Sequence, residues 1–413
     1  MSKILIVGLN FHPEPTGIGK FTGEMAAYLG GAGHQVRAVT SPPYYPYWRV
    51  QDGYRSWAYR RENWHGVQVF RCPLWVPRQP SGPKRLLHHL SFALSSVPIL
   101  LMQIFWRPDV VLCVAPSFFS APLAWIVARL SGARAWLHLQ DFELEAATRL
   151  GILRGEPLAV RLAARAEIWL LQRFDRVSTI SQSMLRRLEA KKIKPERLVL
   201  FPNWVDTESI HPLTDSRESL RKLFDLPPEK ITVLYSGSMG RKQGLEILTE
   251  AARELVSRQD ILFVFCGQGS ARAELELLTS GMPNVRFLRL QPIETLNQLL
   301  NAADIHILPQ RAGAADLVMP SKLLGMLASG KPVIATADLG TEVGRVVREV
   351  GIAIPPDDLA LLSRAILELA ASPQTRARLG KEGRAYVTAH WGTEQVLGRF
   401  LIDLQELVNQ SNH

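Results

Sequence analysis

Cysteine is scarce in this chain of 413 residues, and the three that occur lie far apart in sequence: Cys72, Cys113 and Cys266. No C-x-x-C pair is present, so the sequence supports neither a zinc ribbon nor a thioredoxin-like redox motif. We therefore expect a protein of a reducing compartment.

Several catalytic signatures are missing as well. There is no D-x-D triplet, which argues against a metal-chelated nucleotide sugar on a single-domain scaffold. H-E-x-x-H, G-x-S-x-G and G-x-x-x-x-G-K-[ST] are also absent, so the zinc-peptidase, serine-hydrolase and P-loop classes are unsupported. We expect no bound metal ion and no resident cofactor.

Long hydrophobic runs are few. The apolar run at residues 4–7 is too short for the core of a secretory signal, so we expect none. Residues 88–106 carry no charge and approach the length of a membrane span, but they include two histidines, several polar side chains and Pro98. We interpret this stretch as an amphipathic or buried helix, with a membrane-interface helix as the alternative.

The composition is that of a globular protein, with 47% hydrophobic and 21% charged residues. Forty-eight Lys and Arg oppose 38 Asp and Glu, a net charge of +10 that indicates anionic partners. The excess gathers in residues 37–85, where arginines and aromatic residues interleave. Such a surface suits sugars, bases or lipid headgroups, and a long loop with solvated charges is the alternative. No nucleic-acid recognition motif is present, so we expect no nucleic-acid partner.

Short β-branched runs alternate with helical stretches, which predicts an α/β fold with two doubly wound, parallel-sheet, Rossmann-like domains. The predicted strands of the first half are residues 4–7, 36–39, 67–70, 110–114, 135–139 and 176–180. Those of the second half are residues 231–235, 261–266, 285–288, 305–308, 332–335 and 351–354. We place the domains at 1–205 and 206–387, with residues 388–413 as a C-terminal amphipathic helix able to pack back on the first domain.

Two motifs of the first domain follow predicted strands. Gly17 and Gly19 lie in a turn before a helix, which is a natural anion site, but a tight turn needed only for packing explains them equally well. His138 and Asp141 end the fifth strand, where open α/β sheets bind ligands. They could hold sugar hydroxyls or move a proton, whereas helix capping is the alternative for the acidic residues.

In the second domain, a glycine loop after the first strand contains Gly237 and Ser238 and leads to Arg241 and Lys242. Fixed cations at a helix N-terminus suit a diphosphate, with solvated charges as the alternative.

Ser321 and Lys322 begin another predicted helix, where the helix dipole disfavours a cation unless an anion binds too. Two weaker turn motifs, expected near a nucleotide and its base, contribute Gly267, Gly269, Pro292 and Ile293.

The order of these motifs resembles that of the GT-B glycosyltransferases of family 4, a large retaining group, over nearly the whole chain. The motifs are the first glycine loop and residues 33–36 (GHQV), 180–183 (ISQS), 202–206 (PNWVD), 237–244 (GSMGRKQG), 303–305 (ADI) and 330–333 (GKPV). Residues 138–143 (HLQDFE), 240–246 (GRKQGLE) and 319–322 (MPSK) are similar to colanic-acid-type exopolysaccharide transferases.

The resemblance implies two domains that face each other across a cleft, with donor bound to the second and acceptor to the first. It implies a retaining, metal-independent glycosyltransferase that takes a sugar, fucose in the nearest group, from a GDP-sugar rather than a UDP-sugar. The acceptor would be a lipid-linked saccharide, and the protein would be cytoplasmic and peripheral on the membrane. Arg241 and Lys322 would neutralise the leaving diphosphate.

One departure from the family pattern concerns two glutamates eight positions apart, which are replaced here by Leu317 and Gly325. The second glutamate normally contacts the donor ribose, and Glu342 could substitute for it, whereas Asp316 is adjacent to the first position. A catalytically silent scaffold in a polysaccharide assembly complex and a sugar-nucleotide 2-epimerase therefore stay open as alternatives.

Overall fold

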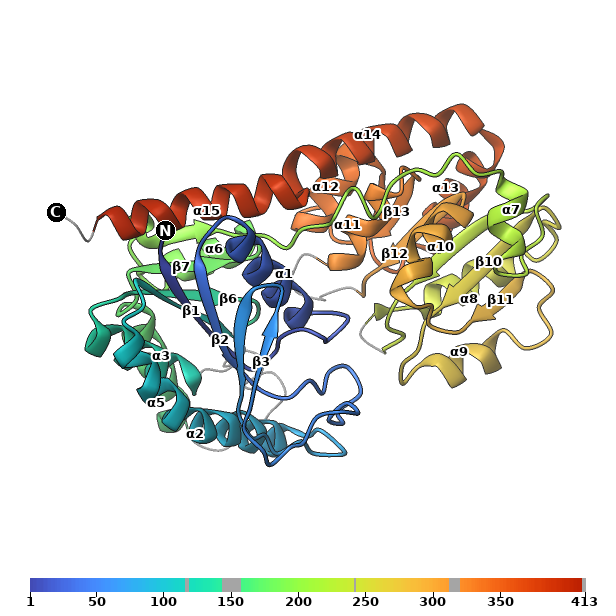
Figure 1. The fold of residues 1–413 in the computed structure, drawn as a ribbon. Helices are drawn as coiled ribbons and strands as arrows, with labels where there is room; N and C mark the ends of the chain where they lie inside the picture. The colour runs from blue at the N-terminus through green and yellow to red at the C-terminus, as the bar shows by residue number, and fades with distance from the viewer. Residues whose placement is uncertain (116–118, 143–156, 241–242, 312–319, 411–413) are drawn as a thin grey trace. The chain divides into compact units, whose positions relative to one another are not determined.

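The computed structural model describes residues 1–115, 119–142, 157–240, 243–311 and 320–410. The chain divides into two units, each with its own sheet (Figure 1). Unit 1 contains Met1–Pro202 and Leu397–His413, and unit 2 contains Asn203–Val396. The expected boundary after residue 205 lies close to this division, whereas the one before residue 388 falls inside helix α14 (Pro373–Trp391).

The sheet of unit 1 has the strand order β3-β4-β2-β1-β5-β6-β7-β8. Among the described residues, every strand pair is parallel except β3 with β4. The strands are β1 (Lys3–Gly8), β2 (Gln35–Thr40), β3 (Arg60–Trp64), β4 (Val67–Arg71), β5 (Val110–Ala115), β6 (Arg134–Leu139), β7 (Arg176–Thr179) and β8 (Leu198–Leu200). The helices are α1 (Ile18–Gly31), α2 (Gly82–Trp106), α3 (Ser120–Ser131), α5 (Pro157–Leu171), α6 (Gln182–Ala190) and the C-terminal α15 (Thr393–Asn409).

The six strands predicted for the first half are confirmed, but β3 and β8 were not predicted. Residues 60–64 lie in the segment for which a long surface loop was one alternative, and they pair antiparallel with β4 at the sheet edge. Most of β3 is exposed, so its sequence (RRENW) carries no apolar run that would indicate a strand. The aromatic rings of Trp136 in β6 and Phe400 in α15 lie 5.0 Å apart, which fixes the end of the chain against this sheet.

Unit 2 has the strand order β11-β10-β9-β12-β13-β14, which is the order 3-2-1-4-5-6 of a doubly wound nucleotide-binding fold. All six predicted strands are confirmed as β9 (Ile231–Ser236), β10 (Ile261–Cys266), β11 (Val285–Leu288), β12 (Ile305–Pro309), β13 (Val333–Thr336) and β14 (Ile352–Ile354). The helices are α7 (Arg217–Lys222), α8 (Glu246–Glu254), α9 (Arg272–Leu278), α10 (Leu296–Ala302), α11 (Ser321–Ala328), α12 (Glu342–Val350), α13 (Leu359–Ala371) and α14.

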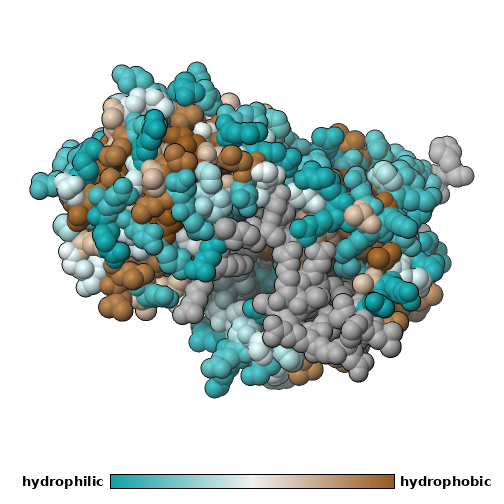
Figure 2. Space-filling model, turned by 180° about the vertical axis from the view of Figure 1, so that it is seen from behind, coloured by the Kyte–Doolittle hydropathy of each residue, from teal (hydrophilic) through white to brown (hydrophobic). Residues whose placement is uncertain are grey.

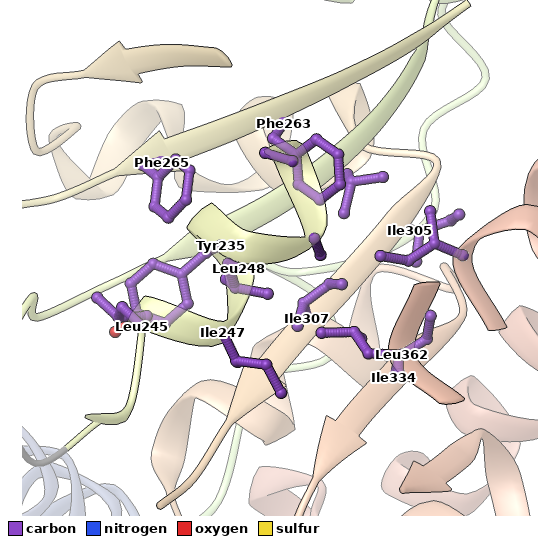
Figure 3. Packing of buried hydrophobic residues seen from close by; sticks show 14 of the residues in the cluster. Tyr235, Leu245, Ile247, Leu248, Phe263, Phe265, Ile305, Ile307, Ile334 and Leu362 are labelled. Atoms are coloured by element: carbon purple, nitrogen blue, oxygen red, sulfur yellow. The ribbon is translucent and has the colours of Figure 1, made fainter. Parts of the chain in front are cut away.

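The inner strands of unit 2, such as β10, β12 and β13, are buried on both faces, which explains their continuous apolar sequences. Phe263 and Phe265 of β10 contribute to one core cluster with Ile305 and Ile307 of β12 (Figure 3). Leu262, Val264 and Cys266, which alternate with these residues along β10, belong to the cluster on the other face. This double burial makes the sheet a rigid base from which the loops at its carboxyl edge project.

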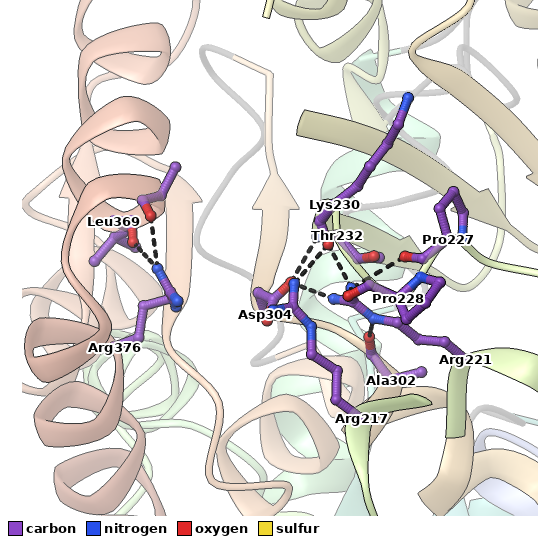
Figure 4. A network of polar contacts seen from close by, with 11 residues as sticks. Arg217, Arg221, Pro227, Pro228, Lys230, Thr232, Ala302, Asp304, Leu369 and Arg376 are labelled. Carbon is purple, nitrogen blue, oxygen red and sulfur yellow. Dashed lines mark hydrogen bonds and ion pairs between the residues drawn. The ribbon is translucent and has the colours of Figure 1, made fainter. Parts of the chain in front are cut away.

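A buried ionic network lies at the amino edge of the same sheet (Figure 4). Arg221 is fully buried and pairs with Asp304, which also accepts the backbone N–H of Thr232 at 2.7 Å and an Nη2 hydrogen of Arg217 at 2.9 Å. Arg221 also donates to the carbonyl oxygens of Ala302, Pro227, Pro228 and Lys230. Asp304 therefore joins the start of β9 to the turn before β12.

Replacing Asp304 by asparagine should lower the free energy of unfolding by about 3 kcal/mol, because Arg221 would keep a buried charge without its counter-ion. Urea denaturation followed by circular dichroism measures the loss. Asp225→Asn is the matched control, because that carboxylate pairs with Arg286 while its side chain is fully exposed. Equal midpoints for the two variants would contradict the structural role of Asp304.

Candidate functional site

A tyrosine and a lysine meet at the carboxyl edge of the second sheet. Tyr235 is near the end of β9, and Lys322 is in the first turn of α11. The Nζ atom of Lys322 lies 2.6 Å from Oη of Tyr235. Oη donates its own hydrogen to the carbonyl oxygen of Ser238, so it accepts a hydrogen from the ammonium group. Burial raises the pKa of Tyr235, which keeps the phenol neutral.

The position of Lys322 explains why residue 237 is glycine. A Cβ atom on Gly237 would lie 2.6 Å from Cε of Lys322, and the φ angle of +136° also disfavours any side chain. Ser238, the next predicted site residue, is exposed beside this contact. The structure therefore brings together three of the predicted site residues: Gly237, Ser238 and Lys322.

The second glycine loop of unit 2 packs against the first. A Cβ atom on Gly267 would lie 1.9 Å from the carbonyl oxygen of Gly237, and one on Gly269 would lie 2.3 Å from that of Met239. The backbone N–H of Met239 donates to the carbonyl oxygen of Gln268 at 2.8 Å. Contact between the two loops is thus sufficient to explain both glycines, and their expected approach to a nucleotide stays a prediction.

Helix α11 begins at the position that the sequence predicts. Pro320 is its N-cap, Ser321 is its first residue, and Gly330 follows its C-cap with a φ angle of +70°. Gly325 lies within the helix, where a Cβ atom would make an ordinary contact of 3.5 Å with Leu300. Close packing therefore does not account for the glycine that replaces the usual glutamate.

Four residues named in the sequence interpretation lie outside the described residues: Arg241, Lys242, Asp316 and Leu317. Their roles remain predictions from sequence.

The remaining predicted donor-site residues lie on other elements. Pro292 and Ile293 are exposed at the start of a short 3-10 turn. Glu342 is in the first turn of α12, which Thr341 caps by accepting the N–H of Gly344 at 3.1 Å. Burial raises the pKa of Tyr386, with smaller contributions from the carboxylates of Glu349 and Glu342.

A pocket of about 470 Å³ is also present in unit 2, but it belongs to another part of the fold. Asp304 and Lys331, which line it, precede β12 and β13, so it opens at the amino edge of the sheet. Burial lowers the pKa of Lys331. Because open α/β sheets bind ligands at their carboxyl edge, we do not assign the donor to this pocket.

The loop after β1 in unit 1 contains a buried carboxylate, Glu14, that was not among the predicted site residues. Its Oε1 atom accepts the backbone N–H groups of Tyr44 and Tyr45 at 3.1 and 3.0 Å, and Oε2 accepts the side-chain amide of Asn10 at 2.9 Å. Burial raises the pKa of Glu14 to about 7. Glu14 thus joins the β1–α1 loop to the segment that follows β2.

Glu14 also accounts for one of the two predicted glycines. A Cβ atom on Gly19 would lie 2.3 Å from Oε2 of Glu14, so packing excludes any side chain there. Gly17 is the N-cap of α1 and has a φ angle of +68°. The structure therefore favours the turn-and-packing alternative for Gly19 and leaves Gly17 at a helix N-terminus.

His138 does not have the environment that its predicted role requires. Its side chain is buried on β6, and burial lowers its pKa to about 3. Nε2 accepts from the amide of Gln140 at 2.9 Å, so Nδ1 carries the hydrogen and donates to Oγ of Ser178, also at 2.9 Å. Ser178 accepts a second hydrogen from Nε1 of Trp136 at 2.8 Å. Both ring nitrogens are used within the core, so the expected contact with sugar hydroxyls does not fit this geometry.

Asp141 follows β6 and is partly exposed. Its Oδ1 atom accepts the backbone N–H of Phe142 at 2.8 Å. The helix that Asp141 would cap lies in residues 143–156, outside the described residues.

The arginines and aromatic residues of residues 37–85 largely contact one another. The guanidinium of Arg60 lies 4.9 Å from the ring of Tyr54, and that of Arg85 lies 5.4 Å from the ring of Trp48. Arg71 is buried and donates to Glu62 at 2.8 Å. The expected ligand-stacking surface is therefore partly used inside the fold.

Within the described part of the chain, no group of three or more His, Cys, Asp or Glu side chains is arranged to hold a metal ion.

The fold and these loops define a class of two-domain transferase. Residues 16–204 match the Glycosyl transferase 4-like domain, and residues 230–372 match the Glycosyl transferases group 1 domain. Sucrose-phosphate synthase from Thermosynechococcus elongatus has a similar fold, with a TM-score of 0.76 at 18% identity over 99% of this chain and 100% of that chain.

Two relatives extend the comparison. The chain is 40% identical to WcaI of Escherichia coli K12, named as a colanic acid biosynthesis glycosyl transferase, over 98% of this chain and 100% of the relative. It is 25% identical to a GDP-mannose-dependent alpha-(1-6)-phosphatidylinositol monomannoside mannosyltransferase of Mycobacterium tuberculosis, over 95% of each chain. The chain therefore belongs to the GT-B glycosyltransferases of family 4, as its motifs predict.

Two residues of interest escaped the sequence interpretation, Tyr235 and Glu14. Tyr235 ends an apolar run and could not be distinguished from a core aromatic residue. The sequence offered only a weak indication for Glu14: it lies between two prolines and near a glycine turn, which is an unusual place for a glutamate that is simply exposed to solvent. Only the tertiary contacts identify their partners.

The pKa of Glu14 predicts a pH-dependent stability. Its folded pKa of about 7 lies above the ordinary value of 4.5, so the stabilisation is complete below pH 4.5 and is lost as the pH rises through 7. Relative to Glu14→Gln, the wild type should lose on the order of 1–3 kcal/mol of unfolding free energy across this interval. Urea titrations at several pH values measure the difference.

Glu189→Gln, at an exposed position of α6, is the control and should follow the wild type at every pH. A constant difference between wild type and Glu14→Gln from pH 4.5 to 8 would refute the assignment.

Proposed function

We propose that this glycosyltransferase moves a sugar from a nucleotide sugar to a lipid-linked saccharide in the biosynthesis of a colanic-acid-type exopolysaccharide. The observation that carries the proposal is the ammonium group of Lys322, held by Tyr235 over Gly237. This contact lies at the carboxyl edge of a doubly wound sheet, beside its central strand, where such folds bind nucleotides.

The chemistry requires a stabiliser for the leaving group. As the bond between the sugar C1 and the diphosphate oxygen breaks, negative charge grows on the diphosphate. Lys322 would neutralise part of this charge, aided by the N-terminus of α11 and, from sequence alone, by Arg241 and Lys242. Because these cations would neutralise the diphosphate, we propose that the reaction needs no metal ion.

We propose transfer with retention of the anomeric configuration. The acceptor hydroxyl attacks C1 from the face that the diphosphate leaves, and an oxygen of the departing phosphate takes the hydroxyl proton. The transition state resembles an oxocarbenium ion, and no enzyme nucleophile is needed. The buried, neutral His138 is compatible with this route, because the route asks no proton transfer of it.

We favour a GDP-sugar over a UDP-sugar as the donor, with fucose as the sugar that is transferred. The support is indirect: one relative is named for colanic acid biosynthesis, and another is named as GDP-mannose-dependent. The second name also refers to a phosphatidylinositol acceptor, which supports a lipid-linked acceptor here. A lipid-linked acceptor in turn favours a cytoplasmic protein held peripherally at the membrane.

A second candidate function is a catalytically silent scaffold in a polysaccharide assembly complex. The observation that favours it is Gly325, which replaces the glutamate usual in the family although a Cβ atom there would make only an ordinary contact. Turnover of any nucleotide sugar by the wild type distinguishes the enzyme from the scaffold.

Lys322→Ala should lower kcat by about 10²- to 10³-fold, the cost typical of removing one group that stabilises developing charge. Release of nucleoside diphosphate from a panel of GDP- and UDP-sugars, with and without EDTA, measures this. Lys381→Ala, a cation of the pocket at the opposite sheet edge, should retain wild-type activity. The proposal fails if the wild type turns over none of these donors or if both variants are equally active.

Tyr235→Phe should lower kcat/KM by about 3- to 30-fold, because Lys322 loses a hydrogen bond made by its charged group. In the Lys322→Ala background the same change should have little further effect, since the two residues act as one unit. Steady-state kinetics of the four proteins complete the cycle, and Tyr386→Phe controls for loss of a hydroxyl elsewhere in unit 2. Additive effects in the double variant would reject the coupling.

A further inference from the structure

Helix α2 exposes a continuous apolar stripe. Seven of its side chains are between 37% and 88% exposed: Leu86, Leu87, Leu90, Leu94, Leu101, Met102 and Phe105. At 100° per residue these positions share one side of the helix, and from the first to the last they extend about 28 Å. The helix is long and apolar enough to cross a membrane, but only 28% of its most apolar window is buried in the fold.

The opposite side of α2 is the more polar one, and it faces the protein. His88, Ser96 and Gln103 are fully or almost fully buried there, together with the apolar Phe92, Ala93 and Leu100. Nδ1 of His88 lies 2.7 Å from the carbonyl oxygen of Trp75, and Oε1 of Gln103 accepts from Arg37 at 3.0 Å. A helix on a water-exposed surface has the reverse arrangement, with its apolar side inward. The amphipathicity of α2 therefore indicates an apolar environment outside the protein.

The packing of α2 favours a helix that lies along a surface over one that crosses a bilayer. It packs against α3 and β2, and the carbonyl oxygen of Ser95 accepts the hydroxyl of Tyr59 at 2.8 Å. A spanning orientation would break these contacts and carry the buried polar side into hydrocarbon. Helix α3 also exposes apolar side chains, at Ile126 and Leu130.

Charge identifies the partner more closely. No acidic residue occurs from residue 63 to residue 108, whereas Arg78, Lys84 and Arg85 precede or begin α2 and Arg107 ends it. These four side chains are all exposed. Cations at both ends of an apolar stripe are typical of helices that lie in the interface of a bilayer containing anionic lipids.

In the described part of the chain outside α2, the exposed leucines do not form such a stripe. Figure 2 shows brown apolar groups among teal ones, gathered mainly on the left of the view, and some exposed apolar surface is normal for folded proteins. In unit 2, Leu223, Leu277 and Leu361 are exposed, but they lie on three different segments. These residues therefore serve as controls for the side chains of α2.

We propose that α2 lies in the plane of an anionic membrane, with its apolar stripe among the acyl chains and its flanking cations on the headgroups. The inference builds on the proposed lipid-linked acceptor and specifies the surface that brings unit 1 to it. Helix α2, rather than the arginine-aromatic residues 37–71, is then the principal membrane contact.

The test is flotation of the full-length protein with vesicles of 70% phosphatidylcholine and 30% phosphatidylglycerol. The wild type should bind them and should bind pure phosphatidylcholine at least tenfold more weakly. The triple variant Leu94→Ser, Leu101→Ser, Phe105→Ser should lose at least tenfold in partition coefficient. The matched variant Leu223→Ser, Leu277→Ser, Leu361→Ser should bind as the wild type does, which controls for loss of exposed leucines.

The proposal is overturned if wild-type protein does not float, if the two triple variants bind equally, or if binding is lost in Arg49→Ser, Arg60→Ser, Arg61→Ser but kept in the α2 variant. Resistance of the bound protein to alkaline carbonate would indicate a spanning helix and also reject it. A wild-type dimer that the α2 changes convert to monomer would assign the stripe to a second copy. Because flotation needs neither donor nor acceptor, its failure leaves the proposed transferase activity to be judged by its own assay.

Discussion

The contact on which the second domain's site depends is the approach of Lys322 to the backbone at Gly237. The lysine can reach Tyr235 only because residue 237 has no side chain, and the loop of Gly237 keeps its position because Gly267 packs directly against it. The loop after β9, the loop after β10 and the start of α11 are thereby held together at one sheet edge. The double burial of those strands supplies the rigid base that this arrangement needs.

Unit 1 uses buried polar groups in a different way. Glu14 and Arg71 are both almost completely buried, and each bonds to backbone groups of segments distant in sequence. Such groups order loops that hydrophobic packing alone would leave undefined, because each buried charge or carboxyl must find its partners. His138 is a similar case. It lies near the end of a strand, but both of its ring nitrogens form hydrogen bonds within the core.

Prediction from sequence succeeded where burial imposes a simple pattern. All twelve predicted strands are present, since strands covered on both faces have continuous apolar sequences. It missed β3, an exposed edge strand stabilised by its pairing with β4. For the arginine-aromatic residues 37–85, it did not show that several rings and cations contact each other. For α2, the sequence left a buried helix and an interfacial helix as alternatives, because periodicity alone does not say which side of a helix faces the protein.

The amino-acid sequence by itself determined the two doubly wound sheets, the family, and the glycine and lysine positions at the carboxyl edge of the second sheet. Those features follow from local patterns of hydrophobicity and turn residues. Only the tertiary structure decided that Tyr235 holds Lys322, that Glu14 is buried between two loops, that His138 belongs to the core, and that the apolar side of α2 faces outward. Each of these features depends on which distant segments meet. Whether burying a polar or apolar side chain stabilises the fold is set by the neighbours that folding brings to it.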